Sequence, residues 1–468
     1  MTVFAARSWL RGLRRRKWRN AFKVWAVRPD RPSGERTRPV LHFAFPARVR
    51  LLILGVRYAA AFFISLASAF SSLLAALARW RRFSRVTWWA PQFLRPYTSV
   101  LIVPTGVGAS IGGYAGDALP AARALASIVD CLISHPNVLN AAMLYWPMPN
   151  VLYVEGYALD RFAEGSWALQ PVHQNKVGLV LDAGIEEEFR MRHLQAADAT
   201  RASLGLPVLE SIITDTPLEV EKWVDPKSGQ STGRIRHPDS LLRAVHSLIS
   251  RSQVNAIAVV GRFPDDDIEE VEDYRHGKGI DLLAGVEAVI SHLVVKEFQV
   301  PCAHAPALAP LPLSSSLCPR SAAEEIGYTF LPCVLAGLSR APQYLVRKVG
   351  SSDHGCVLGS DVDSIVLPID ACGGEATLAL ARSSHKPLMI AVEENETVLE
   401  DTPDKLGIEV VKASNYWEAL GVIAAHKAGI DPKSLRRNGI SNISCSSAVT
   451  PDWNGSMASA LNSTLNPR

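Results

Sequence analysis

The chain has 468 residues, of which 48% are hydrophobic, so it is long enough for two to three domains with sizeable cores. Its net charge of +4 averages two unlike parts: residues 1–96 carry 20 basic and 2 acidic side chains, whereas the remainder carries 29 basic and 43 acidic ones. The acidic body argues against a nucleic-acid-binding protein. Seven scattered cysteines without a C-x-x-C pair argue against a disulfide framework or a zinc ribbon and favour a reducing compartment.

Residues 1–96 are predicted to be a targeting region, because they are rich in arginine and almost free of acids. Within them, residues 58–78 carry no charge over 21 positions, which is long enough to span roughly 30 Å of hydrocarbon as an apolar helix. Three interpretations stay open: a cleaved transit region, a retained membrane anchor, and a wrongly assigned gene start. Serine is scarce before residue 60, which departs from the usual transit peptide.

From Tyr97 onward, short apolar runs alternate with helix-like segments. The strand candidates are Val100–Pro104, Cys131–Ser134, Val151–Val154, Val177–Leu181, Ser211–Thr214, Ala256–Val260, Ile365–Ile369 and Leu388–Val392. The helix candidates are Ala121–Ile128, Glu186–Ser203, Ser240–Ser250, Gly285–Val294, Glu375–Ser383 and Tyr416–Lys427. This alternation predicts an α/β fold, with a Rossmann-like parallel or mostly parallel sheet and helices on both faces.

The α/β body is expected to cover residues 97–430, in one lobe or two. The segment PLPLSSSLCP makes a lobe boundary near 310–320 plausible. Residues 431–468 are rich in Ser, Asn and Gly, and a disordered tail is expected there.

A glycine-rich loop follows the first predicted strand, with five glycines between positions 106 and 116. Such loops between a strand and a helix commonly bind phosphate or another anion through backbone N–H groups. The predicted ligand-binding residues here are Thr105, Gly106, Gly108, Ser110, Gly112 and Gly113. The spacing is neither that of a dinucleotide fingerprint nor that of a P-loop. Residues 108–112 also read G-x-S-x-G, so a second hypothesis makes Ser110 the nucleophile of a serine hydrolase.

A second glycine site follows the strand that ends near Ile369, and Gly373, Gly374 and Thr377 are its predicted ligand-binding residues. The N-terminus of the helix that follows offers free amides to an anion. The alternative is a tight connection in which the glycines only permit a turn. Because each loop leaves a strand and opens a helix, we expect both to share one site for a small phosphorylated or nucleotide-type ligand.

The acid–base candidates flank the loops that could reach such a cleft. They are Asp117, His135, His304, Asp370 and Glu375. The histidines have the alternative of a purely structural role. No metal site is predicted, since no pair of histidines or cysteines has the spacing of a zinc motif. The sequence does not identify a cofactor.

Long motifs resemble a family of cyanobacterial and plant proteins known as a domain of unknown function. They are TGVGASIGGYAGDALP (105–120), SHPNVLNAA (134–142), NVLYVEGYALDRF (150–162), SHLVVKEFQVPCAHAPALAPLPL (291–313), SAAEEIGYTFLPCVLAGLSRAPQ (321–343) and DACGGEATLALA (370–381). The resemblance covers roughly residues 97–430. It implies a chloroplast protein, either in the stroma or anchored in a membrane through 58–78, and it carries over no catalytic residues.

Three classes of function remain at this point. The first is an α/β enzyme, such as a transferase, that acts on a phosphorylated ligand. The second is the serine hydrolase, and the third is a ligand-binding or assembly protein without catalysis. No nucleic-acid partner is expected, and contact with a membrane is expected only through 58–78.

Overall fold

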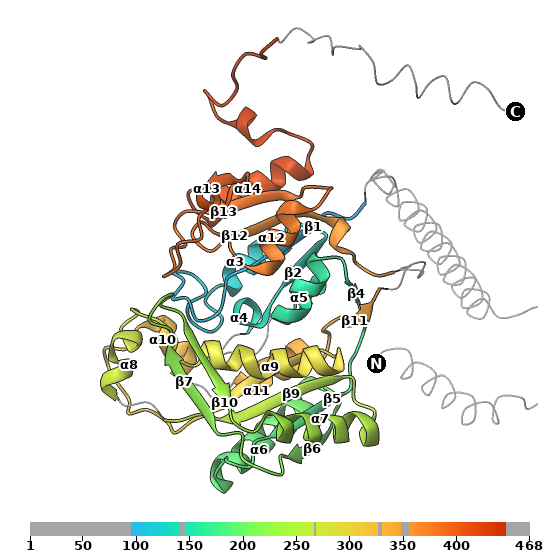
Figure 1. The fold of residues 1–468 in the computed structure, drawn as a ribbon, viewed down its shortest axis with the longest axis vertical. Coiled ribbons are helices and arrows are strands. Elements are labelled where there is room, and N and C mark those ends of the chain that lie inside the picture. Colours follow the sequence, from blue (N-terminus) through green and yellow to red (C-terminus); the bar gives the residue numbers. More distant parts are fainter. Residues whose placement is uncertain (1–94, 141–146, 266–267, 326–329, 348–354, 446–468) are drawn as a thin grey trace, which may run out of the picture. The chain divides into compact units, whose positions relative to one another are not determined.

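The computed structural model describes residues 95–140, 147–265, 268–325, 330–347 and 355–445 (Figure 1). The chain divides into two compact units, Met1–Gln92 and Phe93–Arg468, and the described residues all belong to the second. The predicted apolar helix at 58–78 and nearly all of the predicted targeting region lie outside the described residues. Residues 446–468 of the predicted tail lie outside them too, while its earlier part contains a 3-10 helix, η3 (Pro432–Leu435).

A six-stranded sheet of parallel strands forms the first half of the fold. Its order is β14 (Val411–Ala413), β13 (Leu388–Val392), β12 (Val362–Pro368), β1 (Thr98–Leu101), β2 (Cys131–Ser134) and β3 (Val151–Tyr153). The chain runs outward from β1 to β3 and later resumes on the other side of β1 at β12. This is the doubly wound order, with its topological switch point between β1 and β12. The predicted Rossmann-like sheet is confirmed.

A second parallel sheet is inserted in the chain between β3 and β12. Its order is β10 (Cys302–Ala307), β9 (Ala256–Arg262), β5 (Val177–Leu181) and β6 (Val208–Ile213). The chain passes between the sheets through β4 (Trp167–Gln170) and β11 (Gln343–Val346), which pair with each other in antiparallel register. The segment 310–319 lies inside this insertion, between β10 and α10 (Pro319–Glu325).

Helices cover both faces of each sheet, as predicted (Figure 1). Consecutive side chains of a strand point to opposite faces, so Val100 packs in one core and Leu101 in the other. The core around Leu101 includes residues of α3 (Leu119–Ala126), α14 (Tyr416–Lys427), α6 (Glu187–Leu204) and α11 (Phe330–Leu338). The core around Val100 includes residues of α5 (Gly156–Ala163), α12 (Glu375–Arg382), α7 (Pro238–Ser252) and α9 (Ala284–Phe298).

An antiparallel hairpin, β7 (Val220–Val224) and β8 (Ser231–Ile235), projects from the insertion and packs against α9. The remaining elements are short: α4 (Pro136–Leu139), α8 (Ile268–Arg275), α13 (Pro403–Leu406) and the 3-10 helix η2 (Gly359–Asp361). Within the part of the chain that the structure describes, no helix is both long and apolar enough to cross a membrane.

Candidate functional site

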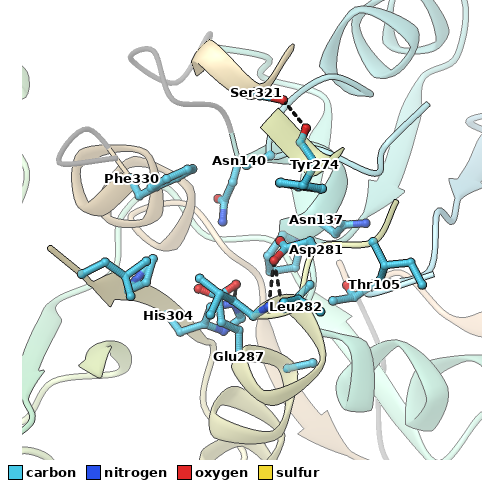
Figure 2. Close-up of a pocket in the computed structure, with 18 of the residues that line it drawn as sticks. Thr105, Asn137, Asn140, Tyr274, Asp281, Leu282, Glu287, His304, Ser321 and Phe330 are labelled. Atoms are coloured by element: carbon cyan, nitrogen blue, oxygen red, sulfur yellow. Dashed lines mark hydrogen bonds and ion pairs between the residues drawn. The ribbon is translucent and has the colours of Figure 1, made fainter. Parts of the chain in front are cut away.

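A pocket of about 260 Å³ lies at the carboxyl edge of the six-stranded sheet (Figure 2). Three of its residues follow successive strands: Thr105 comes after β1, His135 after β2 and Glu155 after β3. The insertion supplies the facing residues, from α8, α9 and β10 and the loops beside them. Because ligands of doubly wound sheets bind at the carboxyl ends of the strands, this pocket is at the edge where a ligand is expected.

Glu155 and His292 form a carboxylate–imidazole pair in this pocket, in which Glu155 is buried and His292 is partly exposed. The Glu155 side chain is 2% exposed, and it caps α5 by accepting hydrogen bonds from the N–H groups of Tyr157 at 2.9 Å and Ala158 at 3.3 Å. Its other oxygen pairs with Nδ1 of His292. Burial lowers the pKa of His292, but the Glu155 carboxylate, together with Asp160 and a backbone hydrogen bond to Ala288, outweighs this, so the net shift is upward. Glu155 therefore orients the ring and favours its charged form.

Two carboxyl groups, Asp281 just before α9 and Glu287 in its first turn, face the same pocket (Figure 2). Asp281 accepts hydrogen bonds from the N–H groups of Leu283 at 2.8 Å and Ala284 at 3.3 Å. Burial raises the pKa of both carboxyl groups, and the neighbouring Asp281 charge raises that of Glu287 further. Burial thus favours the neutral carboxylic acids when the pocket is empty.

His304 on β10 lies beside Glu287, with its Nε2 3.6 Å from the Glu287 carboxylate. Its Nδ1 is 3.1 Å from the hydroxyl of Ser291. Burial lowers the pKa of His304 to about 3, so its imidazole is neutral at physiological pH. The pocket therefore combines neutral carboxyl groups, a neutral imidazole and a carboxylate-held imidazole within a small volume.

His135 lines the pocket, but its imidazole is hydrogen-bonded to the backbone. The N–H of Val103 donates to its Nε2 at 3.0 Å, and burial lowers the pKa of the ring to about 4. Asn137, on the following helix, donates to the carbonyls of Val103 at 2.9 Å and Gly112 at 3.0 Å. Both side chains hold the first glycine loop in place. His135 is thus a structural residue at the pocket wall, whereas His304 stands among its titratable groups.

The first glycine loop approaches other backbone segments closely, which explains several of its glycines. Gly106 and Gly108 have φ of 70° and 61°, values that favour glycine. A Cβ on Gly106 would lie 3.2 Å from the carbonyl oxygen of Ser231, and one on Gly108 would lie 3.0 Å from that of Gly279. At Gly112, with φ of 94°, a Cβ would meet the Val103 side chain. Of this loop's predicted ligand residues, only Thr105 is among the residues that line the pocket.

Ser110 is exposed, and its hydroxyl donates to the carbonyl of Glu396 at 3.3 Å. Arg320 donates to the carbonyl of Ser110 itself. Gly113, three residues further along the loop, would place a Cβ against the carbonyl of Ala109. A carbonyl cannot act as the base that a nucleophilic serine needs. These contacts do not favour the hydrolase hypothesis.

The two glycine loops leave neighbouring strands, since β1 and β12 pair in parallel, so both lie at the same edge of the sheet. The loop after β13 runs between them. Val398 donates its N–H to the carbonyl of Val107 at 2.9 Å. Thr397 donates to the Asp370 carboxylate from its N–H at 2.8 Å and from its hydroxyl at 2.9 Å. Protein groups thus satisfy Asp370 at the switch point.

The amides that follow Asp370 have protein neighbours as well. A Cβ on Gly373 would lie 2.7 Å from the carboxyl carbon of Asp401, so this glycine permits a close approach. The N–H of Ala376, in the first turn of α12, donates to Asp160 at 2.9 Å. Glu375 forms an ion pair with Arg161 at 3.0 Å. Thr377 is buried, and neither it nor Gly374 is among the residues that line the pocket.

Asp117 lies at the end of the first glycine loop, where its Oδ1 accepts a hydrogen bond from the N–H of Gly112 at 2.5 Å. Its Oδ2 lies 3.7 Å from Arg320. Burial raises the pKa of this carboxyl to about 6. It is not among the residues that line the pocket, so its unusual pKa reports on the stability of the loop.

We expect Asp117→Asn to remove a pH dependence of stability between about pH 4 and 6. The folded-state pKa is raised, so the wild-type protein loses stability as the pH rises through this window, by on the order of 2 kcal/mol. Asparagine keeps the acceptor for Gly112 and carries no charge. Urea unfolding of both proteins at pH 4, 5, 6 and 7 measures the difference. If the stabilities of the two proteins change with pH in parallel, ionisation of the Asp117 carboxyl does not destabilise the folded protein.

Sequence reasoning missed Glu155, Asp281 and Glu287 and gave His292 no functional role. Glu155 had a usable signal, because it is an acid directly after a buried strand and before a glycine. Asp281 and Glu287 had none, since acids at this spacing also occur on exposed helices. Among the described residues, no group of three or more His, Cys, Asp or Glu side chains is arranged to hold a metal ion.

Residues 98–436 match the family described as "Protein of unknown function (DUF3326)". The chain belongs to this family. A relative from Synechococcus sp., which carries the name of an uncharacterised lipoprotein, is 57% identical over 343 residues, or 73% of this chain and 94% of the relative. No solved structure matches the chain. The family indicated by the motifs is thereby confirmed, and the DUF3326 match includes both parallel sheets and every residue that lines the pocket.

Proposed function

We propose that this DUF3326 protein binds a small organic molecule in the pocket and catalyses a proton-transfer reaction on it. One observation carries the proposal: the pocket gathers His292, whose pKa is raised by Glu155, with Glu287, whose pKa is raised by burial. Titratable groups with shifted pKa values in one cleft are the usual basis of general acid–base catalysis.

Each group has a distinct role in this proposal. His292 donates a proton to the substrate, and Glu155 keeps the ring oriented and stabilises its charged form. Glu287 accepts a proton once it has been ionised, because burial makes its carboxylate a strong base. Neutral His304 lies beside it, with its Nε2 3.6 Å from the Glu287 carboxylate and its Nδ1 3.1 Å from the Ser291 hydroxyl. Asp281 accepts hydrogen bonds from the amides at the start of α9, and it contributes a second carboxyl group to the pocket.

A phosphorylated or nucleotide-type ligand, with a transferase reaction, is the alternative proposal that the glycine loops support. It would use the amides between Asp370 and Thr377. Two observations weigh against it. Asp160 already accepts the hydrogen bond from the N–H of Ala376, and Glu375 places a carboxylate in the first turn of α12, which would repel an anion. In the pocket, a phosphate would meet the Glu155 carboxylate. The acid–base proposal therefore has the stronger support.

For the location of the protein, we propose the chloroplast, on the basis of the arginine-rich region 1–96 and the resemblance of the body to plant proteins. Attachment to a membrane is a further proposal. It has two sources, the apolar segment 58–78 and the name of the Synechococcus relative, which is that of a lipoprotein.

Filling the pocket tests the proposal. Ala288 lines it from α9, and Ala288→Leu adds volume there without changing a charge. Ala199→Leu, on the exposed side of α6, is the matched control. We expect native mass spectrometry to detect a small molecule retained by the wild type and by Ala199→Leu, and at least tenfold less of it on Ala288→Leu. Equal retention by all three proteins would place the ligand elsewhere.

A further inference from the structure

We propose that the pocket recognises a cationic amine, whose ammonium group binds between Asp281 and Glu287. This inference rests on the proposed function and names the class of its substrate. Asp281 stands just before α9 and Glu287 lies within it, and Figure 2 shows both side chains facing the same space, beside His304. The structure thus aims two carboxyl groups at one region of the pocket.

Two cationic groups lie near this region, Lys222 and Arg275. The charge of Lys222 acts on Asp281, where it opposes the rise in pKa that burial causes. The Arg275 guanidinium binds Glu325 at 2.7 Å and the carbonyl of Pro312 at 2.6 Å. Of the described residues, only the imidazole of His304 comes within ion-pair distance of the Glu287 carboxylate, and burial keeps this imidazole neutral. Glu287 therefore lacks the positive partner that a buried carboxylate normally has.

An ammonium group would supply that partner. It offers N–H donors to both carboxyl groups and repays the cost of ionising them in a buried site. Apolar residues line the rest of the pocket and suit the carbon skeleton of an organic amine. Examples are Val271, Ile280, Leu308 and Phe330. A neutral ligand would leave the two carboxyl groups protonated, and an anionic one would oppose their ionisation and face the Glu155 carboxylate.

Binding should release protons. In the empty pocket burial holds protons on the carboxyl groups, and a bound ammonium favours their ionised form, so the displaced protons pass to the buffer. The O–H bonds of the carboxyl groups are the bonds that break in this step, and the buffer takes up the protons. Other charged or titratable groups also line the pocket or act on the pair: Lys222 of β7, Arg275 of α8, His292 of α9, His304 of β10, Glu325 of α10, His135 after β2 and Glu155 before α5. His292 loses its positive charge as the pH rises, and it then no longer repels an ammonium group. This loss of charge also makes amine binding stronger at higher pH.

Calorimetric titration of the full chain tests this inference with butylamine, 1,4-diaminobutane and agmatine at constant ionic strength. 1,4-Butanediol and succinate are the neutral and anionic matches. We expect only the amines to bind, with an affinity that rises between pH 6 and 8, by up to tenfold per pH unit for each proton released. The binding enthalpy should change with the ionisation enthalpy of the buffer, which reports the released protons. Glu287→Gln should weaken binding at least tenfold, while Glu297→Gln, exposed on the same helix, should not change it.

The outcomes separate this inference from the proposed function. If butanediol or succinate binds and Ala288→Leu abolishes that binding, the pocket is a ligand site but its ligand is not an amine. If the amines bind the wild type without releasing protons, or bind Glu287→Gln equally well, the carboxyl pair does not recognise them. If none of the amines binds, the inference is wrong. If the retained molecule is also unaffected by Ala288→Leu, the proposed function fails with it. The proton release is measured on the wild type, so the test does not depend on how well a variant folds.

Discussion

Replacing Gly285 with alanine is expected to lower the free energy of unfolding by about 3 kcal/mol, because the new methyl group has no room. Gly285 is the second residue of α9, and its Cβ would lie 2.7 Å from Cα of Thr232 and still closer to the carbonyl of Ser231. These are backbone atoms of β8, so they cannot turn aside as a flexible side chain can. Either β8 or the start of α9 must move.

The displacement should also affect the pocket. The N–H of Gly285 donates to the Ser231 hydroxyl at 3.1 Å, and the N–H of Ser231 donates to the carbonyl of Gly106 at 2.9 Å. The start of α9 is therefore linked through β8 to the first glycine loop. Since Asp281 and Glu287 flank Gly285, ligand retention should fall along with stability.

Gly421→Ala is the matched control for this change. Gly421 lies in α14 and is exposed, and a Cβ there would meet nothing within 4 Å. Alanine should stabilise this helix by about 0.5–1 kcal/mol, because glycine loses more backbone entropy on folding. Urea unfolding of the two variants should thus give changes of opposite sign. Changes of the same sign at both positions would mean that helix propensity, and not the contact with β8, governs Gly285.

The strands differ in how well the sequence predicts them. The strands Val177–Leu181 and Leu388–Val392 were predicted at their true bounds, because they are short, mainly apolar runs that pack on both faces. β10 was missed, since it reads CAHAPA and is buried by its position between β9 and the helices. The antiparallel pairs β4–β11 and β7–β8 were missed because their sequences lack a clear apolar pattern.

Some residues of the candidate site could be predicted from the sequence and others could not. His304 could be found from the sequence, because it stands at the end of an apolar run. Asp370 could be found by the same rule, but its carboxylate is satisfied by Thr397 and does not line the pocket. Position after a strand thus indicates nearness to the sheet edge, not whether the side chain is free. Glu287 gains its properties only from the packing of α9 beside β10, which no local pattern encodes.

Asp182 shows most clearly that a residue at the sheet edge need not have a free side chain. Asp182→Ala is the second substitution for which we expect a large effect. The residue follows β5 directly, where an acid resembles a catalytic group, yet it is 1% exposed. Its Oδ1 accepts hydrogen bonds from the N–H groups of Gly184 and Leu218, both at 2.9 Å. Its Oδ2 accepts one from the N–H of Arg262 at 3.0 Å. One carboxylate therefore joins the loop after β5, the segment before β7 and the end of β9.

Asp182→Ala should lower the free energy of unfolding by about 4 kcal/mol, because it leaves buried N–H groups without acceptors, at roughly 1–3 kcal/mol each before relaxation. Asp182→Asn should cost about half as much, since its oxygen still serves two of the amides while its NH₂ group opposes the N–H of Arg262. Asp431→Ala is the control: Asp431 also accepts a backbone N–H, from Lys433 at 2.9 Å, but it is exposed, so water replaces the lost bond and the cost should stay below about 1 kcal/mol. Urea unfolding with a common m-value ranks the three variants. Equal losses for Asp182→Ala and Asp431→Ala would mean that water reaches the end of β5, and that Asp182 is accessible to a ligand after all.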